Sequence, residues 1–395
     1  MRLFDTRTQE VVPFVPAQTV RLYVCGITPY DAAHLGHAFV YASFDALIRY
    51  LECIGHTVHY VRNVTDLDDD TLRTAAKRDT HFQVLARGEA AQFDANLARL
   101  GLRPPAVEPF VTDNVDAMIP FIQGLIDRGV AYSLPDHRVY FNIDHPNYLA
   151  FSQLSKDEAL EQFREKGGDP DAPDKKNTLD FLLWQPSENG QPSWPAPWGA
   201  GRPGWHIGCS VMIHEHIGAT MDIHGGGSDL VFPHHESEIL QAESLTGQHP
   251  LARVWMHCGM VALEGVKMSK SLGNLVFLGD LLNEYSADAI RAMLLNNHYR
   301  ANWTYTTEVM DAAQARVHRW QRVVGDRTGG PITQAEIDGF NDPDLTEALA
   351  QLGDQLEDDL NTPGALAVLD ELADTQRAKA LFMCGRVLGF FQTLR

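Results

Sequence analysis

The sequence predicts an α/β protein with a parallel sheet, an insertion within the sheet-forming part and a helical region after it. Three observations lead to this prediction. A strand–helix–strand pattern occupies residues 20–66, a second strand and helix follow Pro203, and helical periodicity dominates after Tyr299. A strand, a helix and a strand in succession form a βαβ unit, whose two strands lie parallel in one sheet.

The first βαβ unit is the clearest part of the pattern. Residues 20–25 alternate in the manner of a strand and end at Gly26, and apolar residues between 39 and 51 recur with helical spacing. Gly55 stands where a helix is expected to end, and residues 58–64 read as the next strand. The pattern therefore predicts two parallel strands joined by one helix.

Residues 107–200 interrupt the pattern and are predicted to form an insertion between the two halves of a nucleotide-binding fold. They contain a helical stretch at 115–134 and a hairpin around 139–143. A segment dense in Gly, Pro and Asp follows at 165–176 and predicts a loop, which we hypothesise closes over substrate.

The sheet is expected to resume after the insertion. Residues 221–224 read as a strand, the three glycines 225–227 as a turn, and 234–245 as a helix. We expect Cys258 and two further cysteines, Cys53 and Cys384, to pack as small apolar side chains.

The last part of the chain is predicted to be helical and acidic. Amphipathic stretches run over 307–323, 344–360 and 363–394. Residues 301–395 hold 8 Lys/Arg and 15 Asp/Glu, a formal charge of −7, which favours a packing domain over an RNA-binding one. The predicted regions are residues 1–106, 107–200, 201–300 and 301–395.

The composition excludes several classes of protein. The 395 residues are 44% hydrophobic and 21% charged, which is ordinary for a globular protein. No apolar run approaches the ~20 residues of a membrane span, and the start MRLFDTRTQEVVPF lacks the features of a secretory signal. We therefore expect a cytoplasmic protein, and a monomer. A net charge of −20 disfavours a nucleic-acid partner.

Two short segments suit the binding of phosphate. His34-Leu35-Gly36-His37 is expected where a loop enters a helix, and Lys267-Met268-Ser269-Lys270-Ser271 follows 230 residues later. Both combine cationic or imidazole donors with small residues, and a helix start offers free N–H groups to an anion. Alone, the two lysines would read equally well as an exposed, solvated pair.

Four residues form a candidate metal site. Five cysteines without a CxxC pair argue against a disulfide framework in a cytoplasmic chain and leave burial or metal ligation. Thiolate, imidazole and carboxylate ligands suit tetrahedral Zn²⁺, and His234 and Glu238 would share one helix face because they are four residues apart. A buried Cys or His is more often structural, so spacing alone leaves both interpretations open. The four candidates are Cys25, Cys209, His234 and Glu238.

In this order and separation, the histidine and lysine segments resemble the signature pair of class I aminoacyl-tRNA synthetases. Longer runs resemble the cysteine-activating branch of that family, over residues ~20–300 almost without gaps and more loosely beyond. These runs are Cys25-Gly26-Ile27-Thr28, Gly201-Arg202-Pro203-Gly204-Trp205-His206-Ile207 with Cys209-Ser210, Asp222-Ile223-His224-Gly225-Gly226-Gly227 and Phe232-Pro233-His234-His235-Glu236.

The resemblance implies a Rossmann-like parallel-sheet catalytic domain with an inserted connective domain and a C-terminal α-helical domain. It also implies activation of L-cysteine by ATP, with Mg²⁺, to cysteinyl-adenylate and pyrophosphate. One Zn²⁺ per chain on the four candidate ligands would accept the substrate thiolate. His34 and His37 would face the α- and β-phosphates, and Lys267 and Lys270 would hold pyrophosphate.

By the same resemblance, one further set of residues would line the cysteine and adenylate pocket. Asp229 would meet the ribose hydroxyls, and Trp205 and Thr28 are the strongest candidates for contact with cysteine. The full set is Cys25, Gly26, Ile27, Thr28, Asn63, Val64, Thr65, Trp205, Gly227, Ser228 and Asp229.

The branch transfers cysteine to two kinds of acceptor: a tRNA 3′ hydroxyl, giving an ester, or the amine of glucosaminyl-inositol in mycothiol biosynthesis, giving an amide. The run Lys166-Gly167-Gly168-Asp169-Pro170-Asp171, Leu35 in the histidine segment and the acidity favour the sugar amine. The chain also ends about where the helical region ends, so we expect no anticodon-reading domain.

Three positions depart from the pattern of the amide-forming members and keep the acceptor open. Glu238 is typical of the tRNA-charging members, Val40 replaces a hydroxyl residue, and Gly208 replaces a Glu. A tRNA or a different amine therefore stays an alternative. A catalytically silent paralogue is a third possibility, which the intact histidines and lysines disfavour.

Overall fold

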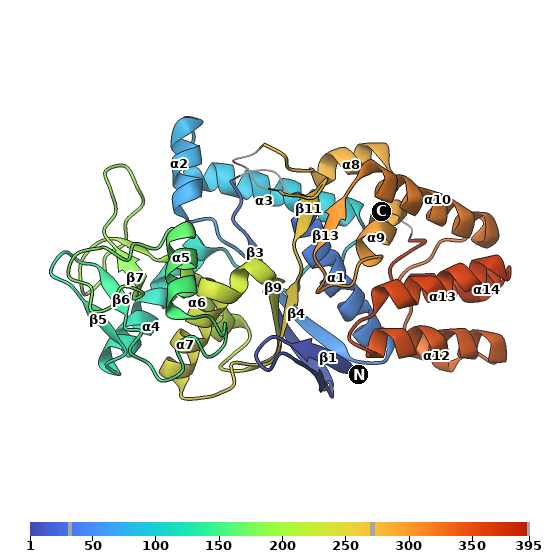
Figure 1. The fold of residues 1–395 in the computed structure, drawn as a ribbon, viewed down its shortest axis with the longest axis horizontal. Coiled ribbons are helices and arrows are strands. Elements are labelled where there is room, and N and C mark those ends of the chain that lie inside the picture. Colours follow the sequence, from blue (N-terminus) through green and yellow to red (C-terminus); the bar gives the residue numbers. More distant parts are fainter. Residues whose placement is uncertain (31–33, 269–272, 393–395) are drawn as a thin grey trace.

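A four-stranded parallel sheet forms the centre of the molecule (Figure 1). The computed structural model describes residues 1–30, 34–268 and 273–392. In spatial order the strands are β10 (Ala252–Cys258), β9 (Met221–Gly227), β3 (Thr19–Ile27) and β4 (Thr57–Val64). All neighbouring pairs are parallel, which confirms the predicted parallel sheet and its first βαβ unit.

The two faces of the sheet pack against different layers. On one face Val20, Leu22 and Val24 of β3 join the core formed with the C-terminal helices, and on the other Tyr23 and Cys25 join the core of the insertion. This alternation follows from the period of two along a strand. The covering helices are α1 (Leu35–Cys53) and α9 (Ala287–Leu295) on the first face, and α4 (Val115–Asp127), α6 (Trp205–His216) and α7 (Glu236–Thr246) on the second.

The segment predicted as an insertion carries its own antiparallel sheet, at the left of Figure 1. The predicted hairpin is confirmed, with Ala131 opposite Phe141. The predicted helix 115–134 is too long, because the chain turns after Asp127 and residues 131–133 pair as a strand. The elements are η1 (Val111–Asn114), α4, β5 (Ala131–Ser133), β6 (Val139–Phe141), α5 (Lys156–Glu165), β7 (Phe181–Gln185) and β8 (Arg202–Pro203).

The predicted turn at the three glycines 225–227 is wrong, since these residues continue β9. A Cβ atom on Gly225 would lie 2.0 Å from the ring of Phe44 in α1. The glycine is there because helix α1 packs closely on the strand, and not because the chain reverses direction.

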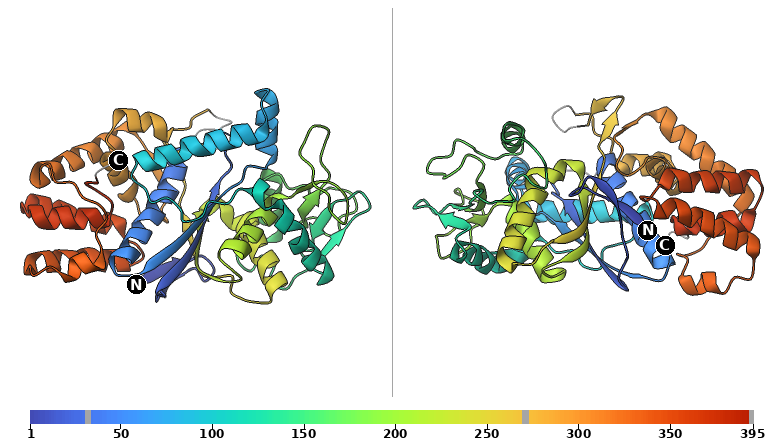
Figure 2. Two further views of the ribbon diagram at one scale, coloured as in Figure 1. Left: turned by 180° about the vertical axis from the view of Figure 1, so that it is seen from behind. Right: turned by 60° about the horizontal axis from the view of Figure 1, so that its bottom comes forward.

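The described C-terminal part is helical, as predicted, and lies on the side of the sheet away from the insertion (Figure 2). The predicted last helical segment, 363–394, contains two helices. The first ends at Asp374 and the second begins at Ala378, and Gln376 between them has φ of 58°. The helices are α10 (Thr307–Val324), α11 (Gln334–Asp338), α12 (Pro343–Glu357), α13 (Thr362–Asp374) and α14 (Ala378–Val387).

A buried ionic cluster joins α1 to α9. The Asp45 carboxylate accepts hydrogen bonds from Arg49 Nε at 2.7 Å and Arg291 Nη1 at 2.6 Å, and both arginines are buried. Arg291 also donates to the carbonyl oxygens of Leu388 and Gly101, so one cluster links the segment after α14 to α1 and α9.

The remaining elements surround the sheet. They are a hairpin of β1 (Arg2–Asp5) and β2 (Glu10–Pro13), helices α2 (Asp69–Lys77), α3 (Phe82–Arg99) and α8 (Leu278–Glu284), and a small sheet of β11 (Val261–Leu263), β12 (Val266–Lys267) and β13 (Trp303–Tyr305). Among the described residues, no helix combines the length and apolar character that crossing a membrane requires. The domain boundaries stay predictions.

Candidate active site and metal centre

The end of strand β3 brings Cys25 into a buried pocket. Cys25 is 5% exposed and lies on the face of the sheet that α6 and α7 cover. The next residue, Gly26, donates its N–H to Asn63 Oδ1 at 2.8 Å. Asn63 Nδ2 in turn donates to Thr65 Oγ1 at 3.1 Å, so the ends of β3 and β4 form one continuous wall of the pocket.

Helix α6 forms the opposite wall. It begins at Trp205, whose indole stacks on the His234 ring with centroids 4.9 Å apart and planes 17° apart. One turn later α6 presents Cys209, which is 2% exposed and lines the same pocket. Trp205 therefore covers the imidazole, and Cys209 faces the thiol of Cys25.

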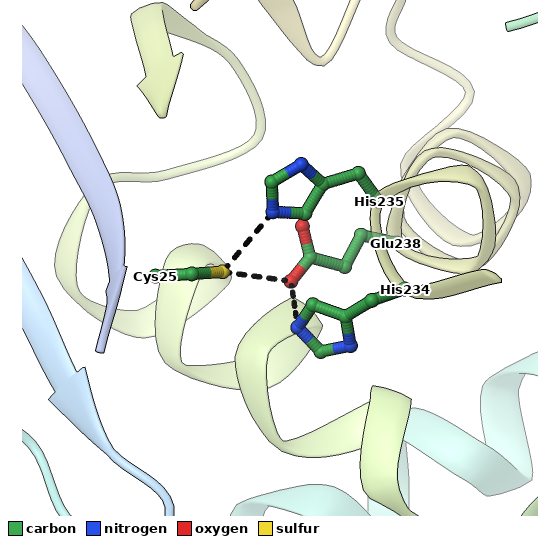
Figure 3. Close-up of side chains that lie close together, drawn as sticks. All are labelled: Cys25, His234, His235 and Glu238. Atoms are coloured by element: carbon green, nitrogen blue, oxygen red, sulfur yellow. Dashed lines mark hydrogen bonds and ion pairs between the residues drawn. The ribbon is translucent and has the colours of Figure 1, made fainter. Parts of the chain in front are cut away.

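A cluster of potential metal ligands lies at the base of the pocket (Figure 3). The turn η3 (Val231–His235) and the start of α7 present two imidazoles and a carboxylate toward Cys25. His234 Nε2 lies 3.1 Å from Glu238 Oε1, and Cys25 Sγ lies 3.7 Å from the same oxygen. One ligand atom from each of Cys25, His234, His235 and Glu238 falls within 4.8 Å of the others.

The predicted ligand Cys209 lines the same pocket, next to Cys25 and His234, but it is not one of the four residues whose ligand atoms lie within 4.8 Å of one another. Those two partners lower the pKa of the Cys209 thiol to about 6, the Cys25 hydrogen bond first, against burial, which raises it. Burial lowers the pKa of His234, but Glu238 and Cys209 raise it more, to about 10. The interactions with Cys25 and His234 thus favour the thiolate form of Cys209.

Electrostatics explain why Glu238 stays ionised in this buried place. Burial raises its pKa, yet His224 and His234 lower it further, and the net effect is a pKa well below the ordinary value. His224 Nε2 lies 2.7 Å from Glu238 Oε2. A buried carboxylate, a thiol and imidazoles converge here, and this mixed S, N and O set of potential ligands suits Zn²⁺.

The analysis of spacing missed His235 and the histidines behind it. His235 Nε2 lies 3.3 Å from Cys25 Sγ, and its Nδ1 lies 2.7 Å from His257 Nε2. His257 Nδ1 is in turn 2.7 Å from Thr6 Oγ1, in the N-terminal hairpin region. The pair of adjacent histidines, His234 and His235, could have indicated a second imidazole at the site. Adjacent residues of a helix point in different directions, however, so only His234 was predicted to face it.

The pocket contains most of the residues predicted to contact cysteine. Thr28, Asn63, Thr65 and Trp205 line it together with Gly26, and Leu230 is an addition. The predicted residues Ile27 and Val64 are buried and pair with each other at the ends of β3 and β4, next to this lining.

The residues predicted to meet adenosine follow β9. Gly227 ends the strand, and Ser228 and Asp229 form the short 3-10 helix η2 (Ser228–Leu230). The Asp229 carboxylate lies over Gly227, since a Cβ atom there would be 2.4 Å from Asp229 Oδ1.

The histidine segment lies where predicted, at the start of α1. His34 is the N-cap, its Nδ1 accepts from Gly36 N–H at 3.2 Å, and its ring lies against the His37 ring, with centroids 3.9 Å apart and planes tilted by 30°. The Leu35 N–H donates to the carbonyl oxygen of Val276 at 2.8 Å, so the strand-like segment after the lysine motif lies against the histidines. Lys267 ends β12, but its side chain and Lys270 lie outside the described residues.

Comparison with known proteins agrees with this arrangement. Residues 11–315 match the family described as tRNA synthetases class I (C) catalytic domain. A protein of Streptosporangium roseum named L-cysteine:1D-myo-inositol 2-amino-2-deoxy-alpha-D-glucopyranoside ligase is 43% identical over 95% of this chain and 89% of its own length. A protein of the same name from Mycolicibacterium smegmatis is 42% identical over 94% of this chain and 88% of its own length.

The fold has counterparts among solved structures. Mycobacterium tuberculosis methionyl-tRNA synthetase in complex with methionyl-adenylate superposes with a TM-score of 0.66 at 15% identity, over 94% of this chain and 89% of that one. Leucyl-tRNA synthetase of Agrobacterium radiobacter gives a TM-score of 0.65 at 11% identity, over 95% and 83%. At these identities the likeness concerns the fold, and it confirms the predicted Rossmann-like class I architecture.

Proposed function

The chain belongs to the class I (C) tRNA synthetase catalytic-domain family, and on this premise we propose that it is an ATP-dependent cysteine ligase. It activates L-cysteine to cysteinyl-adenylate and transfers the cysteinyl group to the amine of glucosaminyl-inositol. The observation that carries the proposal is an identity above 40%, along almost the whole chain, to ligases named for these two substrates.

In the first step the cysteine carboxylate attacks the α-phosphorus of ATP, and pyrophosphate leaves. Such transfer needs positioned donors and no covalent nucleophile. We assign the phosphates to His34, His37 and the start of α1, where backbone N–H groups favour an anion. Lys267 and Lys270 would hold the pyrophosphate, with Mg²⁺ accompanying ATP. Gly227, Ser228 and Asp229 would bind adenosine.

Selection of cysteine is assigned to the buried cluster. We propose that Cys25, Cys209, His234 and Glu238 hold one Zn²⁺, which would supply a Lewis acid able to accept the substrate thiolate. The resemblance gives Cys209 as the fourth ligand, and Cys209 lines the same pocket, whereas His235, whose Nε2 lies 3.3 Å from Cys25 Sγ, is the alternative fourth ligand. Trp205, Thr28 and Asn63 would orient the rest of the amino acid.

In the second step the acceptor amine attacks the carbonyl carbon of the adenylate, an amide forms and AMP leaves. The acidity of the chain, −20 overall, agrees with a small neutral or cationic acceptor better than with a polyanion. The chain is proposed to act as a cytoplasmic monomer.

The test is cysteine-dependent AMP release by the purified, zinc-loaded protein, with glucosaminyl-inositol or matched tRNA as acceptor. We expect stimulation by the sugar amine alone. Stimulation by tRNA alone would replace the proposed acceptor. Absence of cysteine-dependent ATP–pyrophosphate exchange would contradict the activation step itself.

A further inference from the structure

One lysine of the insertion reaches the backbone of the turn that follows β9. Lys166 Nζ donates to the carbonyl oxygens of Asp229 and of Phe232, the latter at 2.5 Å. These two carbonyls lie on either side of Leu230, which lines the pocket, and Phe232 precedes His234 by two residues. A side chain from one part of the fold therefore bridges two points of the active-site turn, residues 228–232.

The local sequence sets the position of Lys166. Helix α5 begins with a capping box between Ser155 and Glu158 and ends with Lys166 as its C-cap. The N–H groups of Gly168 and Gly167 then donate to the carbonyl oxygens of Phe163 at 2.8 Å and Arg164 at 3.2 Å, the paired bonds of a Schellman motif. The backbone at Lys166 is thus held by its own helix, independently of the active-site turn.

The turn that receives these bonds is irregular. Phe232 has φ of −132° and ψ of 138°, so the helical hydrogen-bond pattern is interrupted between η2 and α7. Carbonyl groups at such a break need donors from elsewhere. An ammonium donor makes charge-assisted bonds that are stronger than those between neutral groups. Contact between α5 and η3 brings Lys166 within reach.

We propose that Lys166 is a positioning residue that holds residues 228–232 in the form that binds ATP, and so couples the insertion to the nucleotide site. The inference rests on the proposed function, because that function places adenosine on residues 227–229. Loss of the ammonium group leaves every residue of the pocket lining unchanged, but releases the turn to other conformations.

Lys175 offers a matched control within the same loop. Its Nζ also donates to two backbone carbonyl oxygens, those of Asp169 and Thr178, both at 2.7 Å. Both acceptors belong to the insertion loop and not to the active-site turn. Lys175→Met therefore removes the same kind of bonds, together with the contacts of Lys175 over the Tyr140 and Phe163 rings, but it removes no donor to residues 228–232.

The experiment compares the wild type with Lys166→Met, Lys166→Arg and Lys175→Met. Calorimetry gives the Kd for ATP in the presence of Mg²⁺, and pyrophosphate exchange gives KM and kcat. We expect Lys166→Met to weaken ATP binding about tenfold, which corresponds to the loss of one charge-assisted bond. KM for ATP should rise in parallel with little change in kcat, Lys166→Arg should restore most of the affinity, and Lys175→Met should stay within about twofold.

Equal Kd values for ATP in Lys166→Met and Lys175→Met would overturn the inference, as would unchanged binding in Lys166→Met. Thermal unfolding of the two methionine variants checks that neither is globally destabilised relative to the other. A failure of the proposed function gives a different result. The wild type would then show no cysteine-dependent pyrophosphate exchange, while calorimetry would still measure the effect of Lys166→Met on the Kd for ATP.

Discussion

Gly26 lies so close to the backbone of Asn63 that a residue with a side chain does not fit at position 26. The Gly26 N–H donates to Asn63 Oδ1 at 2.8 Å, and a Cβ atom on Gly26 would lie 1.5 Å from the Asn63 carbonyl oxygen. The obstacle is backbone, which cannot rotate away as a side chain can. This contact sets the spacing between the ends of β3 and β4, where Cys25 and Thr65 line the pocket.

Gly26→Ala is expected to separate these strand ends and to abolish cysteine activation. Overpacking of this kind typically costs about 1–3 kcal/mol, and we expect the upper part of that range together with loss of exchange activity. Gly88→Ala is the control, since Gly88 lies in the exposed face of α3 with open space around its Cβ position. It should leave activity intact and, in a helix, raise stability slightly. Full activity in Gly26→Ala would contradict the proposed pocket.

Cys209→Ser is expected to lose bound zinc, because it replaces a thiolate ligand of lowered pKa with a weak hydroxyl donor. Metal content after dialysis against a chelator is the measurement. Cys53→Ala should keep its metal, since Cys53 is buried in α1 among the apolar residues of the first core. If Cys209→Ser keeps one zinc per chain and His235→Ala loses it, then His235 is the fourth ligand.

His257→Leu should weaken metal binding although His257 lies behind the ligands. It breaks the chain from Thr6 through His257 and His235 to Cys25. Direct hydrogen-bond partners of metal ligands contribute about 10–100-fold in metal affinity, and we expect the lower end of this range because His257 acts through His235. Thr6→Val should change affinity in the same direction by less. Thr375→Val removes an exposed hydroxyl bonded to Glu371 and is the control. Competition with a chromophoric chelator measures all three, and unchanged affinity in His257→Leu would show that the chain does not support the site.

Asp45→Asn is expected to destabilise the fold by about 3–5 kcal/mol, because it leaves the charges of Arg49 and Arg291 buried without a counter-ion. Asp354→Asn, at an exposed position of α12, should have little effect. Urea unfolding at neutral pH measures both. A loss below about 1 kcal/mol for Asp45→Asn would mean that the arginines find other partners.

The same carboxylate predicts a pH dependence. Burial raises the pKa of Asp45, but Arg49 and Arg291 lower it more, so its pKa in the folded protein is below the ordinary value. Its contribution to stability is complete above the unfolded-state pKa of about 3.9 and is lost as the pH falls through the lower folded value. The wild type should therefore lose part of its stability advantage over Asp45→Asn as the pH falls below about 4, which unfolding at a series of pH values would measure.

Structural features that depend on residues close together in the sequence could be predicted from the sequence. The alternation in residues 20–25 and the helical spacing in 39–51 predicted β3 and α1, and the i,i+4 spacing of His234 and Glu238 predicted that their side chains lie together. Their prediction succeeded because strand and helix periods repeat within a few residues. The histidine segment was placed at a helix start for the same reason.

Other features depend on contacts between distant segments. The glycines 225–227 read locally as a turn, yet they continue a strand because α1 packs against Gly225. His235 meets Cys25 across 210 residues, and Lys166 meets Phe232 across 66. No helical or strand periodicity in the sequence predicts either contact.

The amino-acid pattern was sufficient for the parallel sheet, the family resemblance and the chemical types that gather at the site. Which thiol meets which imidazole follows from how β3, α6 and α7 pack together. Which lysine meets the turn after β9 follows from the contact between α5 and η3. Local periodicity specifies the direction of a side chain relative to its own element, whereas burial of the apolar faces fixes the elements relative to one another.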